Sequence, residues 1–307
     1  MLLRQLEYLV ALSRTRHFAR AAEECYVSQP ALSGSIRKLE EELRVPLVRR
    51  SRRYEGLTPE GERIVLWAKR LLADRDAMHE EVRALRSGIT ARLRLGSVPT
   101  AVTAVALLTQ EFCTCNPLAR VEVLADLQTD DITARLRTYE LDAAVTYQPG
   151  KDDAADFAFL PLYRERFVLL SQDTSEHGKL PEVSWAEAAR QPLCLLHPRM
   201  FGRRILNAVF AEAGTLVEPR VETDSVASLF AHVRTGQFAS VVPHAWLHVF
   251  GVPAGLCATP LVNPVHTAQI GLLTLRREPA SVATQALLAA AGGIDMTAQL
   301  GRIPGSR

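Results

Sequence analysis

The chain has few of the features that mark secreted, membrane-bound or disulfide-linked proteins. Its five cysteines are odd in number and scattered over 307 residues, which does not suit a disulfide framework and fits a reducing compartment. No apolar run approaches the roughly 20 residues that a membrane-spanning helix needs. The segment MLLRQLEYLV has no basic-then-apolar signal layout. We therefore expect a cytoplasmic protein without a membrane partner.

Motifs of enzymes and metal proteins are also missing. The chain contains no nucleophile elbow, phosphate-binding glycine loop or convincing triad, so we expect no catalysis and no cofactor. Cys113 and Cys115 have no other clustered ligands and make a poor zinc site, so no metal is expected. Cys194 lies in an apolar strand and is interpreted as buried. His244 and His248 lack the glutamate of an HExxH pattern and are interpreted as surface histidines.

Overall charge excludes little, but its distribution is informative. The net charge is +2, from 36 basic and 34 acidic residues. Five arginines and no acidic residue lie between Arg44 and Arg53, immediately before a Tyr-Glu-Gly turn signal. Such a segment is typical of a two-stranded wing whose arginines neutralise DNA phosphates or enter a narrow minor groove. A solvated run of charge is the alternative interpretation.

The residues before this basic segment predict a helix-turn-helix. A short helix over Phe18–Glu24 is followed by Ser28, whose oxygen can cap a second helix, and by Pro30 in the first turn of that helix. Leu32 and Ile36 begin an apolar stripe that continues through Leu39 and Leu43 and predicts the buried face. The polar start of this second helix is then free to enter a major groove.

A long helix is predicted from Pro59 to about Ser87, with Thr58 as its cap. Its apolar residues form a narrow stripe that favours pairing with a second copy of the chain, as in a coiled coil. Contact with the neighbouring domains is the alternative. The stripe consists of Ile64, Ala68, Leu71, Met78, Val82 and Leu85.

From Arg92 onward, short strands alternate with helices, which predicts parallel α/β architecture. In such sheets, ligands bind beyond the strand ends, close to helix N-termini. Candidate ligand contacts therefore lie at strand ends and helix starts, where a plain helix cap is the alternative for Thr129 and Ser225. The candidates are Ser97, Thr100, Thr129, Tyr147, His197 and Ser225.

The string AAEECYVSQPALSGSIRKLEEEL, followed by LTPEG, resembles the winged helix-turn-helix of LysR-type transcriptional regulators. The similarity continues, more weakly, through the remaining chain. It implies residues 1–58 as a DNA-binding domain, 59–88 as a linker and dimerisation helix, and 89–307 as an effector-binding domain. It also implies two α/β subdomains with a cleft between them, as in periplasmic binding proteins, and crossing strands near 159–162 and 262–267.

The resemblance implies base-edge contacts from the second helix and phosphate or minor-groove contacts from the wing. Two positions depart from the family pattern: Gly34 stands where many members carry a longer polar side chain, and Val48 replaces a frequent Phe at the base of the wing. A glycine inside a helix also costs roughly 1 kcal/mol relative to alanine. The expected DNA-binding residues are Ser28, Gln29, Pro30, Ser33, Arg37, Arg50 and Arg53.

The expected function is sequence-specific transcription regulation controlled by a small-molecule effector such as a small anion. The expected partners are promoter DNA, RNA polymerase and further copies of the chain, in a dimer or tetramer. Two alternatives remain. One is a solute-binding protein with an N-terminal extension, against which the missing signal peptide argues. The other is a thiol redox switch within the same family.

Overall fold

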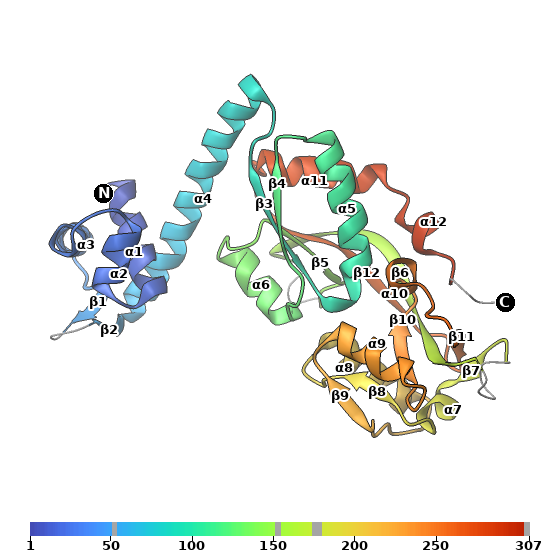
Figure 1. Cartoon of the computed structure of the whole chain (residues 1–307). Coiled ribbons are helices and arrows are strands. Elements are labelled where there is room, and N and C mark those ends of the chain that lie inside the picture. The colour runs from blue at the N-terminus through green and yellow to red at the C-terminus, as the bar shows by residue number, and fades with distance from the viewer. Residues whose placement is uncertain (51–53, 151–154, 174–179, 304–307) are drawn as a thin grey trace. The chain divides into compact units, whose positions relative to one another are not determined.

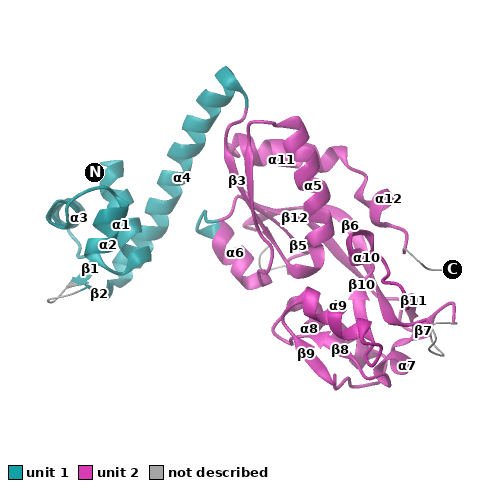
Figure 2. Ribbon diagram, in the orientation of Figure 1, with its two compact units in different colours: residues 1–88, 137–140 teal, residues 89–136, 141–307 magenta. Residues whose placement is uncertain are grey.

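The computed structural model describes residues 1–50, 54–150, 155–173 and 180–303. They form two compact units, shown in Figure 2. The N-terminal unit comprises residues 1–88 and 137–140, and the C-terminal unit comprises residues 89–136 and 141–307. Along the part of the chain that the structure describes, no helix is both long and apolar enough to cross a membrane.

The N-terminal unit contains three helices, a two-stranded wing and one long helix, labelled in Figure 1. The elements are α1 (Leu3–Thr15), α2 (Phe18–Glu24), α3 (Gln29–Leu43), β1 (Val48–Arg50), β2 (Tyr54–Leu57) and α4 (Pro59–Ser87). Ser28 caps α3 as predicted, because its hydroxyl accepts a hydrogen bond from the Ala31 N–H at 3.4 Å. Leu32, Ile36 and Leu39 are fully buried beneath this helix, so its opposite face is free.

Glu40 joins α3 to the wing. Its Oε1 accepts hydrogen bonds from the Leu47 and Val48 N–H groups at 2.9 and 3.1 Å. The start of α4 then lies against the same segment: a Cβ added at Gly61 would be 2.0 Å from the Leu47 carbonyl oxygen. Only glycine allows this approach, so the wing and α4 are held in a fixed relation.

Helix α4 packs against the N-terminal unit along one side of its first half, and it exposes apolar side chains elsewhere. Val65 and Ala68 are buried in the core of the N-terminal unit, and Arg75 forms an ion pair with Glu7 of α1. Of the predicted stripe, Ala68 is buried in this core and Ile64 packs against it, so these two residues contact the neighbouring domain. Several apolar side chains elsewhere on the helix are exposed, namely Leu66, Trp67, Leu71, Met78, Val82 and Leu85.

The C-terminal unit is an α/β structure of two lobes (Figure 1). The first lobe contains β3 (Arg92–Ser97), η1 (Pro99–Ala101), α5 (Val102–Cys115), β4 (Arg120–Leu124), α6 (Thr129–Arg137), β5 (Ala143–Tyr147), β12 (Thr267–Leu275) and α11 (Val282–Gly293). The second contains β7 (Val183–Ser184), α7 (Trp185–Ala189), β8 (Cys194–Leu196), α8 (Phe201–Glu212), β9 (Val221–Thr223), α9 (Val226–Arg234), β10 (Ser240–Pro243), α10 (Trp246–Phe250) and β11 (Leu256–Val262). Strand β6 (Phe157–Gln172) belongs to both lobes, and α12 (Met296–Leu300) contacts it.

The strand order β4-β3-β5-β12-β6-β11-β7 joins the two lobes through β6. Strand β3 is parallel to β4 and β5, as expected, whereas β12 is antiparallel to β5 and β6. Residues 157–166 of β6 pair with β12, and residues 167–172 pair with β10 or β11. The first crossing therefore lies at Arg166–Phe167, later than the expected 159–162. One continuous strand makes it, so no turn in the sequence marks the position.

Candidate functional site

The start of α3 presents a polar, exposed surface. Gln29, Pro30 and Arg37 are exposed, and Ser33 is half-buried. Ser28 is also exposed, but its hydroxyl is engaged as the helix cap. A helix start of this kind, backed by a buried apolar stripe, has the geometry that a major groove admits.

The wing forms where the basic segment predicted it. Strands β1 and β2 are antiparallel, with Val48 opposite Leu57. Arg50 ends β1, and Arg49 beside it is exposed. Arg53, the other expected wing contact, lies outside the described residues.

One exposed side chain near α3 was not anticipated. Tyr26 is 96% exposed at the bend between α2 and α3, with a φ of 55°. It stands two residues before Ser28, the cap of α3, so its ring lies next to the polar start of that helix in the chain. The signal in the sequence was the position of an aromatic residue within the turn, which the helical pattern alone did not explain.

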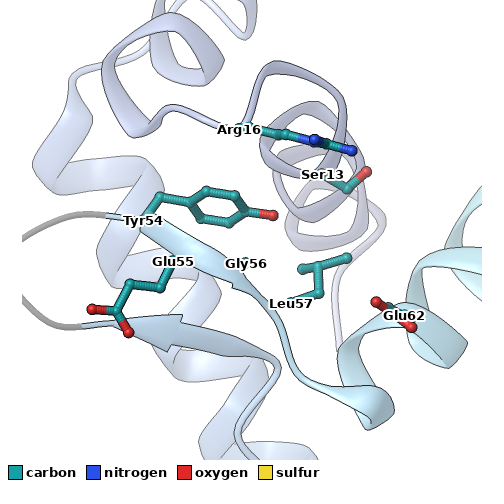
Figure 3. A pocket seen from close by; sticks show the side chains of 7 residues that line it. All are labelled: Ser13, Arg16, Tyr54, Glu55, Gly56, Leu57 and Glu62. Carbon is teal, nitrogen blue, oxygen red and sulfur yellow. The ribbon is translucent and has the colours of Figure 1, made fainter.

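The N-terminal unit also has a hollow of about 380 Å³, shown in Figure 3. It lies between the end of α1 and strand β2, with Arg16 and Tyr54 on one side and Glu62 of α4 on the other. None of the expected DNA-binding residues lines it. Glu55 and Glu62 make it unsuitable for a phosphate group, so we assign the hollow no role in DNA contact.

A smaller cavity of about 60 Å³ lies in the C-terminal unit, between the two lobes. Three helix starts meet there: that of η1 and α5, that of α6 and that of α8. Helix N-termini carry free N–H groups and a partial positive charge, so the cavity favours a hydrogen-bond acceptor. Its lining residues are Val98, Pro99, Thr100, Asp126, Leu127, Gln128, Leu196, Met200, Phe201 and Gly202. We call this cavity the interlobe cleft.

Thr100 is the expected ligand contact that lines the interlobe cleft. The residue is 4% exposed, and its hydroxyl lies near the Tyr147 phenol without a hydrogen bond of normal geometry. A buried hydroxyl without a partner costs free energy that a bound ligand can recover. Thr129 opens α6 directly after the lining residue Gln128, and its buried hydroxyl also lacks a partner.

The other expected contacts do not line the cleft. Ser97 is buried, and its hydroxyl donates to the Val98 carbonyl at 2.8 Å. His197 follows β8, and its Nδ1 accepts a hydrogen bond from the Arg199 N–H at 3.2 Å. Ser225 is exposed and caps α9, the alternative interpretation given above. Its hydroxyl accepts a hydrogen bond from the Ser228 N–H at 3.3 Å, and the residue is absent from the lining of the cleft.

Tyr147 lies behind the cleft, at the end of β5. A Cβ added at Gly202 would be 3.1 Å from Thr100 Cγ2 and 3.2 Å from the Tyr147 hydroxyl. Gly202 of the second lobe therefore brings the start of α8 close to the first lobe. The Tyr147 hydroxyl donates to Glu165 Oε2 at 2.8 Å, which connects the back of the cleft to strand β6.

Glu165 is the polar residue of this region that sequence reasoning missed. It is fully buried, and burial raises the pKa of its carboxyl to about 8. The Tyr163 hydroxyl donates to its Oε1 at 3.4 Å. In the sequence it lies between Arg164 and Arg166, where a glutamate is ordinarily solvated. The available signal in the sequence was that Glu165 alternates with the two arginines and shares a strand face with Tyr163 and Phe167.

His244 corrects the expectation of a surface histidine. It is fully buried, and burial lowers the pKa of its ring to about 4. Its Nδ1 accepts a hydrogen bond from the Arg166 N–H at 3.0 Å, so the ring supports the first crossing. His248 is partly exposed, and its Nε2 lies 2.8 Å from the Arg302 carbonyl oxygen.

The cysteines differ in environment. Cys194 is fully buried in β8 as expected, and burial raises its pKa. Cys113 and Cys115 are exposed at the end of α5, and a hydrogen bond to Glu111 raises the pKa of Cys115. Among the described residues, no group of three or more His, Cys, Asp or Glu side chains is placed to hold a metal ion.

Comparison with known proteins accounts for both units. The family model "Bacterial regulatory helix-turn-helix protein, lysR family" matches residues 3–62, and the model "LysR substrate binding domain" matches residues 86–293. The DNA-binding transcriptional dual regulator OxyR of Escherichia coli is 29% identical over 279 residues, which cover 89% of each chain. The transcriptional regulator EstR of Acinetobacter baylyi is 40% identical over 178 residues, covering 57% of this chain and 58% of EstR.

Solved structures agree with this assignment. A full-length OxyR variant from Pseudomonas aeruginosa superposes with a TM-score of 0.75 at 26% identity, covering 97% of this chain and 95% of that one. CbnR in complex with its target DNA has the same fold, with a TM-score of 0.66 at 21% identity, covering 95% of this chain and 99% of that one. The chain thus belongs to the LysR family of transcriptional regulators, as a DNA-binding regulator with an effector-binding domain rather than an enzyme.

Proposed function

We propose that this regulator recognises promoter DNA through the start of α3 and responds to a small molecule bound in the interlobe cleft. The observation that carries the second part is the Thr100 hydroxyl, buried and without a normal hydrogen bond where three helix starts converge. A ligand that bound there would contact both lobes. If the ligand binds one arrangement of the lobes more tightly than another, it would shift the population toward that arrangement by the difference in binding free energy.

The cleft defines the chemistry of the effector. Its walls are largely apolar, and its polar groups are helix N–H groups, the Thr100 hydroxyl and the Gln128 amide. Asp126 also lines it but is exposed, so its charge is screened by water. We therefore propose a compact molecule with an oxygen acceptor, such as a small carboxylate.

Replacing Thr100 tests this site. Thr100→Val removes the hydroxyl and keeps the branched shape, and we expect at least a tenfold loss of affinity for a carboxylate identified by thermal-shift screening of the full chain. Thr114→Val is the matched control, because Thr114 lies at the exposed end of α5 and its hydroxyl bonds only the Gln110 carbonyl. Equal binding by both variants would refute the assignment of the cleft.

For DNA, we propose base contacts from Gln29, Pro30 and Ser33 on the α3 surface. Arg37 lies on the same helix, and Ser28 orients its start. From the wing, Arg50 and Arg53 are proposed to contact phosphates or the minor groove. Tyr26 is added to this surface, because its exposed ring at the bend is free to lie against the DNA backbone. Footprints of the purified full chain that protect unrelated promoters equally would contradict sequence-specific recognition.

Self-association is proposed to occur through α4. Leu71, Met78, Val82 and Leu85 are exposed on a single chain, with Leu85 84% exposed. Burying such side chains is worth roughly 1.5 to 3 kcal/mol each, and a second α4 offers a complementary apolar surface. A dimer places two copies of α3 on two half-sites of DNA. We further propose RNA polymerase as a partner, on the strength of family membership alone.

A thiol redox switch is the second candidate. It is favoured by relatives named "Hydrogen peroxide-inducible genes activator". Reactive thiols need a lowered pKa and access to solvent, whereas Cys194 is buried with a raised pKa and Cys115 also has a raised pKa. We therefore prefer the small-molecule effector. Joint replacement of Cys113, Cys115 and Cys194 by serine decides the matter, since loss of a peroxide response in transcription would establish the switch.

A further inference from the structure

The carboxyl of Glu165 is surrounded by two phenol hydroxyls and forms no ion pair among the described residues. Its two oxygens face the hydroxyls of Tyr147 and Tyr163, at 2.8 and 3.4 Å. Among the described residues, no ionised side chain contacts the carboxyl. The His244 ring lies 6.4 Å from the Tyr163 ring and is neutral at pH 7, because burial lowers its pKa to about 4.

The two protonation states of Glu165 arrange the Tyr147 hydrogen differently. An ionised carboxylate has no hydrogen to donate, so both phenols must donate to it. A neutral carboxyl has one hydrogen and can donate it to the Tyr147 oxygen. The Tyr147 hydrogen is then released and can point to another acceptor.

Thr100 is placed to act as that acceptor. Its buried hydroxyl lies near the Tyr147 phenol and has no hydrogen bond of normal geometry in this structure, so it is open to a new partner. A Cβ added at Gly202 of α8 would be 3.1 Å from Thr100 Cγ2 and 3.2 Å from the Tyr147 hydroxyl, which places both side chains beside the interlobe cleft that Thr100 lines. When Tyr147 donates to Thr100, the Thr100 hydrogen is available to a ligand. When Tyr147 donates to Glu165 instead, Thr100 can donate to the phenol oxygen and offers only lone pairs to a ligand.

We propose that Glu165 sets the direction of a hydroxyl relay through Tyr147 and Thr100, and so determines whether the interlobe cleft donates or accepts a hydrogen bond. This inference rests on the proposed binding of an effector in that cleft. It makes Glu165 a positioning residue for effector specificity. A ligand with an acceptor oxygen selects the neutral carboxyl, and its binding is linked to retention of one proton.

The relay also predicts how affinity changes with pH. Because the pKa of Glu165 is about 8, most of the protein holds the neutral carboxyl at pH 7 and the cleft donates. At pH 9 about one tenth of the protein does so. Affinity for an acceptor ligand should therefore fall about tenfold between pH 7 and pH 9.

The first experiment needs no ligand. The Trp246 indole N–H donates to the Thr100 carbonyl at 3.1 Å, so its ¹⁵N–¹H resonance reports on Thr100. In the full chain labelled with ¹⁵N-tryptophan, we expect this resonance to titrate near pH 8. The three indole signals are assigned with Trp67→Phe and Trp185→Phe variants. A native Trp246 resonance that is flat between pH 7 and pH 9 would overturn the relay.

Two variants interrupt the relay at different points. Glu165→Gln removes the titrating group, and Tyr147→Phe keeps it but removes the connecting hydroxyl, so both should abolish the Trp246 transition. Glu212→Gln, at an exposed position of α8, is the control that should keep it. A transition that persists in Tyr147→Phe shows that Thr100 senses Glu165 by another path, which contradicts the proposal even if Glu165→Gln fails to fold.

The second experiment uses acetate as the acceptor probe and methylammonium as a donor probe of similar size. Native protein should lose about tenfold in acetate affinity from pH 7 to pH 9, and Glu165→Gln should show no such loss. Methylammonium should not follow the acetate trend, and a parallel loss would contradict the relay. If acetate fails to bind while the Trp246 transition is present, the proposed ligand class is wrong and the relay stands.

Discussion

The two units of this regulator differ in where the partners of their important residues lie. In the N-terminal unit, Ser28 caps α3 through a residue three positions away, and the wing follows α3 directly in the chain. In the C-terminal unit, Glu165 meets Tyr147 from another strand, and the interlobe cleft is lined by segments as distant as Thr100 and Gly202. The DNA-binding unit is thus built largely from local contacts, whereas the proposed ligand site depends on contacts between remote segments.

The largest expected effect is the destabilisation of the N-terminal unit by a single substitution at Gly61. In Gly61→Ala, the added Cβ would meet the Leu47 carbonyl oxygen at 2.0 Å, and a backbone atom cannot move aside. We expect a loss of about 3 to 5 kcal/mol in the stability of the N-terminal unit. Operator binding should disappear, as measured by fluorescence anisotropy of labelled DNA.

The same variant should leave the C-terminal unit intact. Trp185 and Trp246 are both buried in that unit, so their fluorescence reports on its unfolding. An unchanged denaturant midpoint for these two tryptophans, in a Trp67→Phe background, is the expected result. If Gly61→Ala also lowered the denaturant midpoint of the C-terminal unit, the two units would not be independent in stability, and the comparison would fail.

The second effect is a change of the free energy of unfolding with pH, which depends on the buried carboxyl of Glu165 in the C-terminal unit. Burial raises the pKa of Glu165 from its ordinary value of 4.5 to about 8 in the folded protein. The unfolded chain therefore releases this proton first, and stability is lost as the pH rises from about 4.5 to about 8. Glu165→Gln should remove the loss, which is on the order of 4 kcal/mol at pH 8.

The difference in stability between the native chain and Glu165→Gln isolates the contribution of Glu165. His244 has the opposite pH dependence, because its lowered pKa costs stability as the pH falls from 6.5 to about 4, but it is present in both proteins and cancels in the difference. The urea midpoint of the native chain should therefore fall relative to that of Glu165→Gln as the pH rises from about 4.5 to about 8. Above pH 8 the difference between the two midpoints should stay constant. A constant difference across the range would show that Glu165 does not titrate as described.

A third effect separates specificity from general affinity at the DNA surface. Gln29→Ala should relax base preference at a cost of roughly 1 to 3 kcal/mol for the preferred operator. Arg53→Ala should weaken binding to all sequences and reduce the dependence of affinity on salt. Competition assays at several salt concentrations measure both quantities. If Gln29→Ala keeps full operator preference, α3 does not recognise bases through this residue.

The smallest effect concerns Gly34 on α3. A Cβ at this position would meet no atom within 4 Å, so alanine is tolerated without strain. We expect Gly34→Ala to stabilise the N-terminal unit by up to about 1 kcal/mol, since alanine restricts the unfolded chain and favours the helix. Thermal denaturation followed by circular dichroism measures the change. A destabilised variant would mean that the helix needs the flexibility of glycine here.

Much of the N-terminal unit could be predicted because its determinants are close in sequence. Ser28, Pro30 and the stripe from Leu32 to Leu39 predicted both the start and the buried face of α3. Thr58 likewise predicted the start of α4, since its hydroxyl accepts from the Gly61 N–H at 2.9 Å. Caps and periodicity act within one or two helical turns, so a linear pattern contains the information.

In the C-terminal unit, the order of strands and helices was predictable but the environment of single side chains was not. Ser225 and Thr100 both stand near helix starts, yet one is an exposed cap and the other lines the cleft. His244 and Glu165 look like surface residues in the sequence and are fully buried. Their burial depends on which strands become neighbours, and the pattern along one strand does not specify that.

The sequence by itself determined the helix-turn-helix, the wing, the long helix α4 and the alternating α/β elements, because hydrophobic periodicity and capping are local interactions. Only the tertiary structure decided which polar groups lost contact with water. Pairing β6 with β12 in the first lobe and with β10 and β11 in the second placed Glu165 between two phenols. Desolvation there depends on atoms from several remote segments, and so it arises only when the lobes assemble.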